Sequence, residues 1–178
     1  MCTSAPYAGS VFPITGPTYT PDGIVSLEKG NTQTFAETIC EFTGADLFRI
    51  ERENPYPDDY EAICSISRQE TESGARPALK ADIETDSYDV IYIDWPCWGG
   101  TMPMCVRTFL ESHDLSGKNI IPFSTHEGSG FGHGLEDLKA SCPGATIIEG
   151  LALAGHEVKD AQDQIRAFCG NGKYRQVL

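Results

Sequence analysis

The chain has 178 residues, of which 26 are acidic and 13 are basic, so its formal net charge is −13. This length suits one domain with a full core. The negative charge makes nucleic acid and anionic membranes poor partners. The seven cysteines form an odd set without CxxC spacing, which argues against a disulfide framework or a zinc ribbon and favours a reducing, cytoplasmic compartment. No apolar run approaches the length that spans a membrane.

Residues 1–23 differ in composition from the rest of the chain. They are rich in Pro, Gly, Ser and Thr, and Asp22 is their only charged residue. They lack the basic start and the continuous apolar core of a signal peptide. We therefore predict an irregular arm outside the core, with a short extended piece at residues 10–14.

From residue 24 onward, short apolar runs alternate with helical patterns. The predicted strands cover residues 24–27, 47–50, 90–93, 119–124 and 146–148. The predicted helices cover residues 33–43 and 57–72, a segment that begins at Pro103, a short segment around Leu135 and Leu138, and residues 157–168. The alternation predicts one α/β domain over residues 24–170 with a mostly parallel sheet, followed by a frayed tail at residues 171–178.

Three loops follow predicted strands, at residues 28–32, 94–102 and 125–134. In a doubly wound sheet, such loops meet in one crevice. The first leads into a helix whose backbone N–H groups can hold a phosphate. The second carries the two tryptophans of the chain, and the third offers glycines and hydroxyls that can approach a flat polar ring. Together they describe a mononucleotide site that fits flavin mononucleotide (FMN) best, although each loop alone is more often a turn and the tryptophans could equally pack inward.

Six blocks of sequence carry a family resemblance. They are GNTQTFAETICEFTGADLFRIE at residues 30–51, NPYPDDY at 54–60, ARPALK at 75–80, YDVIYIDWPCWGGTMPM at 88–104, TFLESHDLSGKNIIPFSTHEGSGFG at 108–132 and CPGATIIEGLAL at 142–153. Across residues 30–155 the chain resembles the flavodoxins, in particular the bacterial flavodoxin-like subgroup. The resemblance implies a three-layer flavodoxin-like α/β fold with a five-stranded parallel sheet of order 2-1-3-4-5.

The resemblance also implies non-covalent FMN used for one- and two-electron transfer. It places the FMN phosphate at Gly30, Asn31 and Thr32. The flavin ring would lie against two sets of residues: Pro96, Trp98, Gly100, Thr101 and Met102 from one loop, and Thr125, His126, Gly128, Ser129, Gly130, Phe131 and Gly132 from the other. We expect an electron carrier without a catalytic residue, or, if the protein is an enzyme, an FMN-dependent oxidoreductase. The acidic surface suits redox partners with basic docking surfaces.

Several positions depart from the flavodoxin pattern. They are Leu27, Glu28 and Lys29, where hydroxyl residues are usual before the phosphate loop; Asp94 and Glu127, where Gly is usual; and Gly99, where a second Trp is usual. Glu28 adds a negative charge near the phosphate, which Lys29 would offset by turning inward. We therefore expect FMN to bind weakly, and a flavin-free interaction module with the same fold stays open as an alternative.

Two other features suggest further chemistry. His126, His133 and Glu127 are close in sequence, but no further spaced ligand accompanies them, so we predict no metal site. Cys97 lies in the second loop and is interpreted as a small packing residue.

Overall fold

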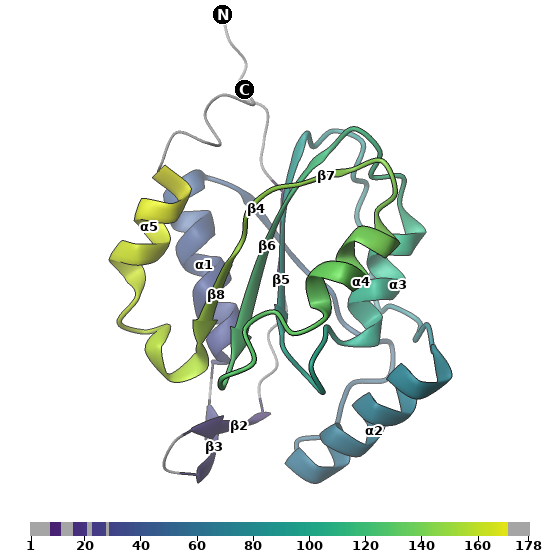
Figure 1. Ribbon diagram of the computed structural model, residues 1–178, viewed down its shortest axis with the longest axis vertical. Helices are drawn as coiled ribbons and strands as arrows, with labels where there is room; N and C mark the ends of the chain where they lie inside the picture. The colour runs from purple at the N-terminus through teal and green to yellow at the C-terminus, as the bar shows by residue number, and fades with distance from the viewer. Residues whose placement is uncertain (1–7, 12–15, 21–22, 28, 171–178) are drawn as a thin grey trace, which may run out of the picture.

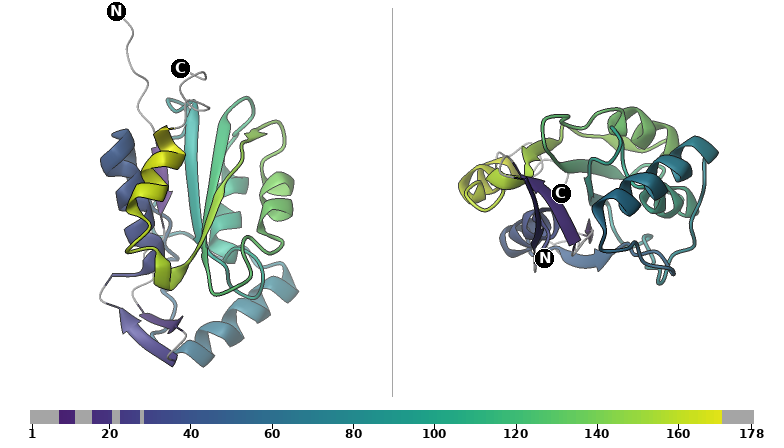
Figure 2. Two further views of the ribbon diagram at one scale, coloured as in Figure 1. Left: turned by 60° about the vertical axis from the view of Figure 1, so that its left-hand side comes forward. Right: turned by 90° about the horizontal axis from the view of Figure 1, so that it is seen from below.

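The computed structural model describes residues 8–11, 16–20, 23–27 and 29–170, with side chains described from residue 29 onward. A parallel sheet lies between two layers of helices, with α1 (Asn31–Thr43) and α5 (Gln162–Gly170) on one face (Figure 1). The opposite face is covered by α3 (Met104–Ser112) and α4 (Gly134–Ser141), as the turned view in Figure 2 also shows. The predicted α/β class with a parallel sheet is confirmed.

The sheet contains six strands rather than the five predicted. They are β1 (Ala8–Val11), β4 (Asp46–Arg49), β5 (Val90–Pro96), β6 (Asn119–His126), β7 (Thr146–Ile147) and β8 (Leu151–Ala154). Their order is β4-β1-β5-β6-β7, and β8 pairs with the later part of β6. Every pairing in this sheet is parallel. The sixth strand arises because the chain leaves β6 after Ile147 and returns to it at Leu151.

The amino-terminal segment is where the prediction was wrong. Residues 8–11 do not belong to an irregular arm outside the core, because β1 pairs with β4 on one side and with β5 on the other. The predicted first strand at residues 24–27 does form, as β3 (Gly23–Leu27), but it pairs with β2 (Gly16–Thr20) in a separate antiparallel hairpin. Pairing in the middle of a sheet uses backbone groups, so a segment without an apolar run can fill this place.

Several element boundaries also differ from the predicted ones. Helix α2 (Tyr60–Ser73) begins three residues later than predicted, because Asp59 accepts a hydrogen bond of 2.8 Å from the Ala62 N–H and acts as its N-cap. The last helix begins at Gln162 rather than at residue 157, after the 3₁₀ turn η1 (Gly155–Glu157). Strands β5 and β6 extend two or three residues beyond the predicted runs, so both reach into the predicted loops.

The core has one cluster on each face of the sheet, and β5 contributes to both. Its residues Ile91, Ile93 and Trp95 pack toward α3 and α4, whereas Val90 and Tyr92 pack toward α1 and α5. Trp95 has no exposed surface, which confirms inward packing for one of the two tryptophans. Among the described helices, none is long and apolar enough to cross a membrane.

Candidate functional site

The three predicted loops meet at the carboxyl edge of the sheet, the lower edge in Figure 1. The hydroxyls of Thr32 and Thr125 share a buried hydrogen bond of 2.6 Å, which joins the start of α1 to the end of β6. The His133 N–H donates to the Gly100 carbonyl over 2.7 Å and joins the second loop to the third. The structure therefore brings together the segments that the sequence analysis assigned to one site.

The amino terminus of α1 offers free hydrogen-bond donors. Its N-cap is the buried Gly30, which has no side chain to cap the helix, and the first turn contains no acidic residue. The earliest intrahelical bond runs over 3.0 Å from the Thr34 N–H to the Gly30 carbonyl. The N–H groups before Thr34 have no intrahelical acceptor. Together with the dipole of a 13-residue helix, these groups form a place for an anion.

Lys29 does not turn toward this helix end. Its ammonium pairs with Glu37 on the surface of α1, and 46% of its side chain is exposed. Burial raises the pKa of Glu37, but hydrogen bonds from Lys29 and Gln33 outweigh it and leave that pKa below its ordinary value. Lys29 is therefore not turned inward, which was the condition for offsetting the charge of Glu28, and Glu28 itself lies outside the described residues.

The second loop is a tight turn between Trp98 and Thr101. The Trp98 N–H donates to the Thr101 carbonyl over 2.8 Å, and the return bond measures 3.1 Å. Gly99 and Gly100 have φ values of 57° and 87°, a left-handed conformation that side chains disfavour. The half-buried Trp98 meets Tyr56 edge to face, with ring centroids 5.0 Å apart. This turn can present the aromatic face of Trp98 beside a backbone that two hydrogen bonds hold in place.

The other predicted residues of this loop have different roles. Met102 is 1% exposed and its side chain belongs to the core, so it can offer only backbone atoms to a ligand. Pro96 is half-buried at the end of β5. Thr101 is also buried, and its hydroxyl donates to the carboxylate of Asp137 on α4 rather than pointing to a ligand.

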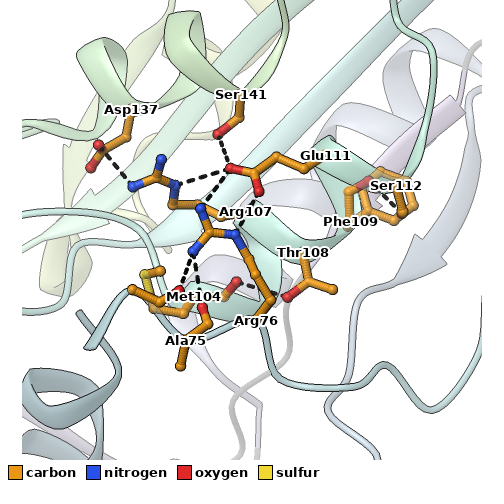
Figure 3. Close-up of polar contacts among 11 residues, drawn as sticks. Ala75, Arg76, Met104, Arg107, Thr108, Phe109, Glu111, Ser112, Asp137 and Ser141 are labelled. Atoms are coloured by element: carbon orange, nitrogen blue, oxygen red, sulfur yellow. Dashed lines mark hydrogen bonds and ion pairs between the residues drawn. The ribbon is translucent and has the colours of Figure 1, made fainter. Parts of the chain in front are cut away.

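A network of charged side chains continues from the Thr101–Asp137 hydrogen bond, and Figure 3 shows its part from Asp137 to Arg76. Asp137 pairs with Arg107 over 3.2 Å, and Arg107 lies 3.5 Å from Glu111. The Arg76 guanidinium donates hydrogen bonds of 2.6 and 2.8 Å to the two carboxylate oxygens of Glu111, and this contact lowers the pKa of Glu111. The network thereby links the Thr101 hydroxyl to helices α3 and α4.

The third loop approaches the second very closely. Gly132 has a φ of 53°, and a Cβ atom there would lie 2.0 Å from the Gly100 carbonyl oxygen. Gly128 and Gly130 also have positive φ values, of 115° and 58°. Ser129 and Gly132 are exposed, and the Ser129 carbonyl accepts from the Gly132 N–H over 2.9 Å. A polar ligand placed here would meet backbone rather than side chains.

Two predicted residues of this loop are engaged elsewhere. The ring of His126 accepts a hydrogen bond of 2.9 Å from the Gly128 N–H through Nδ1. Phe131 packs against Trp95, with ring centroids 5.7 Å apart. Among the described residues, no three His, Cys, Asp or Glu side chains group closely enough to hold a metal ion.

Asp94 is a buried carboxyl group at this edge. It is 1% exposed, and neither of its carboxylate oxygens hydrogen-bonds a side chain among the described residues. Burial raises the pKa of Asp94 well above its ordinary value. Strand alternation places it on the face of α1, in register with Phe123 and two positions short of Thr125 along the sheet.

Sequence reasoning missed the contribution of η1 to the site. A Cβ on Gly155 would lie 2.6 Å from the Asn31 amide nitrogen and 2.7 Å from Oε1 of Glu127. The other carboxylate oxygen of Glu127 lies 2.9 Å from Nδ1 of His156. The Glu127–His156 pair therefore lies near the first residue of α1, Asn31, on the other side of Gly155. Ligands in such folds bind beyond the carboxyl ends of the strands, and η1 directly follows the carboxyl end of β8. A prediction of β8 from the sequence would therefore have indicated η1 as part of the site.

Comparison with known proteins identifies the family. The flavodoxin family model matches residues 25–168. A candidate flavoprotein of Bacteroides eggerthii DSM 20697 is 29% identical, with 91% of this chain and 98% of that chain covered and a TM-score of 0.68. One from Bacteroides uniformis ATCC 8492 is 25% identical, with 92% and 99% covered and a TM-score of 0.71.

A third solved structure, a flavoprotein of Lactobacillus acidophilus NCFM in complex with FMN, is 17% identical, with 88% of this chain and 98% of that chain covered and a TM-score of 0.65. At this identity the likeness concerns the fold. No curated protein sequence matches the chain. The family match extends over most of the chain and includes all three loops of the site, so the chain belongs to the flavodoxin family.

Proposed function

We propose that the protein binds FMN and transfers electrons. The observation that carries this proposal is that three segments meet at one edge of the sheet. They are the amino terminus of α1, which has no side-chain cap, the turn from Trp98 to Thr101 and the loop at residues 125–134. FMN has an anionic phosphate at one end and a flat ring at the other, so its two ends match these two parts of the edge. When bound, FMN supplies one- and two-electron chemistry. The Lactobacillus acidophilus flavoprotein, solved with FMN, agrees with this choice of ligand.

Each part of the site would contribute differently to binding. The first N–H groups of α1 would hold the phosphate, and the paired hydroxyls of Thr32 and Thr125 would fix the helix end beneath it. Trp98 would cover one face of the ring and exclude water from it. The backbone of Gly128–Gly132 would meet the polar edge of the ring. Thr101 and Met102 would shape the turn without using their side chains on the ligand.

The fold fits FMN, but the charges around the phosphate end do not favour tight binding. Lys29 is paired with Glu37, and the carboxylate of Glu127 borders Gly155 on the side of the Asn31 amide. We therefore propose that FMN binds weakly enough for part of it to be lost during purification. This part of the proposal concerns affinity and not the identity of the site.

The test is a flavin-fluorescence titration of the wild-type protein and two matched threonine variants. Thr32→Val removes the hydroxyl that bonds Thr125, whereas Thr38→Val removes a buried hydroxyl on the same helix that bonds only the Thr34 carbonyl. One lost hydrogen bond is worth about 1 kcal/mol, or roughly a fivefold change in affinity. We expect that loss in Thr32→Val alone.

Two results would contradict the proposal. Equal losses in both variants would show that FMN does not use this helix end. No FMN binding beyond that of an unrelated acidic protein would leave the flavin-free interaction module as the function.

We further propose that the redox partners dock through basic surfaces. The net charge of −13 supports this choice, because opposite charges steer association. Transfer to a cationic acceptor should slow as salt rises, since the screening length shortens to about 10 Å at 0.1 M. A transfer rate that ignores ionic strength would refute it. The cytoplasmic location stays a prediction from the cysteine pattern.

A further inference from the structure

We propose that the Glu127–His156 pair determines how strongly the site prefers a phosphorylated flavin over an unphosphorylated one. The inference rests on the proposed function, because it assumes that a flavin phosphate would lie at the start of α1. It assigns a role to two side chains that the flavodoxin pattern does not explain: Glu127 replaces a usual Gly, and His156 lies on a turn after the last strand.

Geometry places the pair at the phosphate end rather than at the ring end. Gly155 is buried, and a Cβ atom on it would come within 2.7 Å of both the Asn31 amide nitrogen and Oε1 of Glu127, so these two groups both border position 155. Asn31 is the first residue of α1. The absence of a side chain at position 155 therefore allows the Glu127 carboxylate to reach the helix end.

The charges of the pair act in opposite directions on a phosphate. A phosphate monoester carries about −1.5 to −2 charges at pH 7, so the Glu127 carboxylate opposes it. His156 lies 2.9 Å from the other carboxylate oxygen and, when protonated, offsets that charge. Lys29 does not supply this offset, because it is paired with Glu37. Riboflavin has the same ring and ribityl chain without the phosphate, so it should not respond to either charge.

Other acidic groups lie on β5, α1 and η1, and Glu157 directly follows His156 on η1. Asp94 is buried on the same face of the sheet as α1, and Glu37 is paired on the outer surface of that helix. Neither contacts Glu127 or His156 in the described structure through a hydrogen bond or an ion pair. The balance between Glu127 and His156 can thus be altered without breaking another contact.

The experiment measures the affinities of FMN and riboflavin for each protein and compares their ratio. Glu127→Gln keeps the size of the side chain and removes its charge, and His156→Gln removes the basic ring while retaining a hydrogen-bond donor. Glu136→Gln is the matched control, because Glu136 is 85% exposed and pairs with His133 over 3.7 Å on α4. It changes the net charge by the same amount as Glu127→Gln.

We expect Glu127→Gln to raise the FMN-to-riboflavin affinity ratio about tenfold, as one nearby charge typically can, and His156→Gln to lower it several-fold. The control should leave the ratio unchanged within about twofold, and added salt should shrink the differences. A merely structural role would weaken both flavins together and could not give changes of opposite sign.

The outcomes separate this inference from the proposed function. If the proteins bind both flavins but the ratio stays constant in Glu127→Gln, the inference is overturned while the proposed function stands. If no protein in the series binds either flavin, both are overturned.

Discussion

The buried carboxyl of Asp94 makes a specific prediction about stability and pH. Asp94 is 1% exposed, and burial raises its pKa well above the ordinary value of about 3.9 for an aspartate in an unfolded chain. Between those two pKa values, the folded protein binds a proton that the unfolded chain has released. Unfolding then becomes easier as pH rises, because stability falls wherever the folded state binds more protons.

The magnitude follows from the same linkage. Each pH unit within this window removes about 1.4 kcal/mol from the free energy of unfolding. For a chain of this size, 1 kcal/mol corresponds to about 2–4 °C in melting temperature. We therefore expect Asp94→Asn to gain stability relative to wild type by about 3–5 °C per pH unit as pH rises above 4.

Thermal unfolding from pH 4 to pH 8 measures this effect. Asp89→Asn is the matched control, since Asp89 is an exposed residue just before β5 and its substitution removes one carboxyl of the same kind. The control also accounts for the general repulsion of a chain with a net charge of −13. If the stability difference between Asp94→Asn and wild type did not change with pH, Asp94 would titrate normally and the reasoning would fail.

Three further predictions concern the loops, a buried cluster and the sheet. Gly132→Ala should weaken FMN binding at least tenfold, because its Cβ would lie 2.0 Å from the Gly100 carbonyl; Gly44→Ala, with a φ of 75° and open space, measures the backbone cost alone. Tyr56→Phe should cost about 1–2 kcal/mol in urea unfolding, because Glu70, 8% exposed, loses a hydrogen bond of 2.8 Å. Gly9→Pro should destabilise the protein by about 3 kcal/mol or more, and Val25→Pro by clearly less.

Local signals in the sequence predicted the elements that frame the site. Helix α1 was expected over residues 33–43 and covers Asn31–Thr43, and Gly44 ends its apolar stripe as predicted. The start of α3 followed from Pro103, which the structure places at the N-cap. Glycines in the second and third loops marked turns, and their positive φ values show why glycine occupies those positions. Glycine and proline act on the backbone of their immediate neighbours, so the turns and helix ends that they cause can be predicted from one sequence.

Contacts between distant segments were not predictable in the same way. The Glu127–His156 pair joins residues 29 positions apart through the close approach at Gly155. The Tyr56 ring reaches Trp98 from a loop that precedes α2. The sequence left open which way Lys29 turns, and the structure shows its ammonium paired with Glu37 on α1. These contacts depend on how the helices pack, which a periodic pattern does not encode.

The amino-terminal strands illustrate the limit most clearly. The family match begins at residue 25, so it includes most of β3 but leaves β1 outside. Only residues 28–30 separate β3 from α1, a length typical of strand-to-helix loops, whereas residues 12–30 separate β1 from the same helix. Local reasoning therefore favours β3 as the strand before α1.

The backbone pairing instead places β1 between β4 and β5 in the sheet. The two proline substitutions, Gly9→Pro and Val25→Pro, test this placement. A proline lacks the N–H that a central strand donates to its neighbours, so it is tolerated far less between two strands than in a two-stranded hairpin. Gly9 lies in register with Leu47 on one side and with Tyr92 on the other, whereas within the described part of the chain Val25 pairs only with Thr18. The larger loss of stability must then come from Gly9→Pro. A larger loss from Val25→Pro would mean that residues 24–27 occupy the centre of the sheet, and that the segment outside the family match is not needed to complete it.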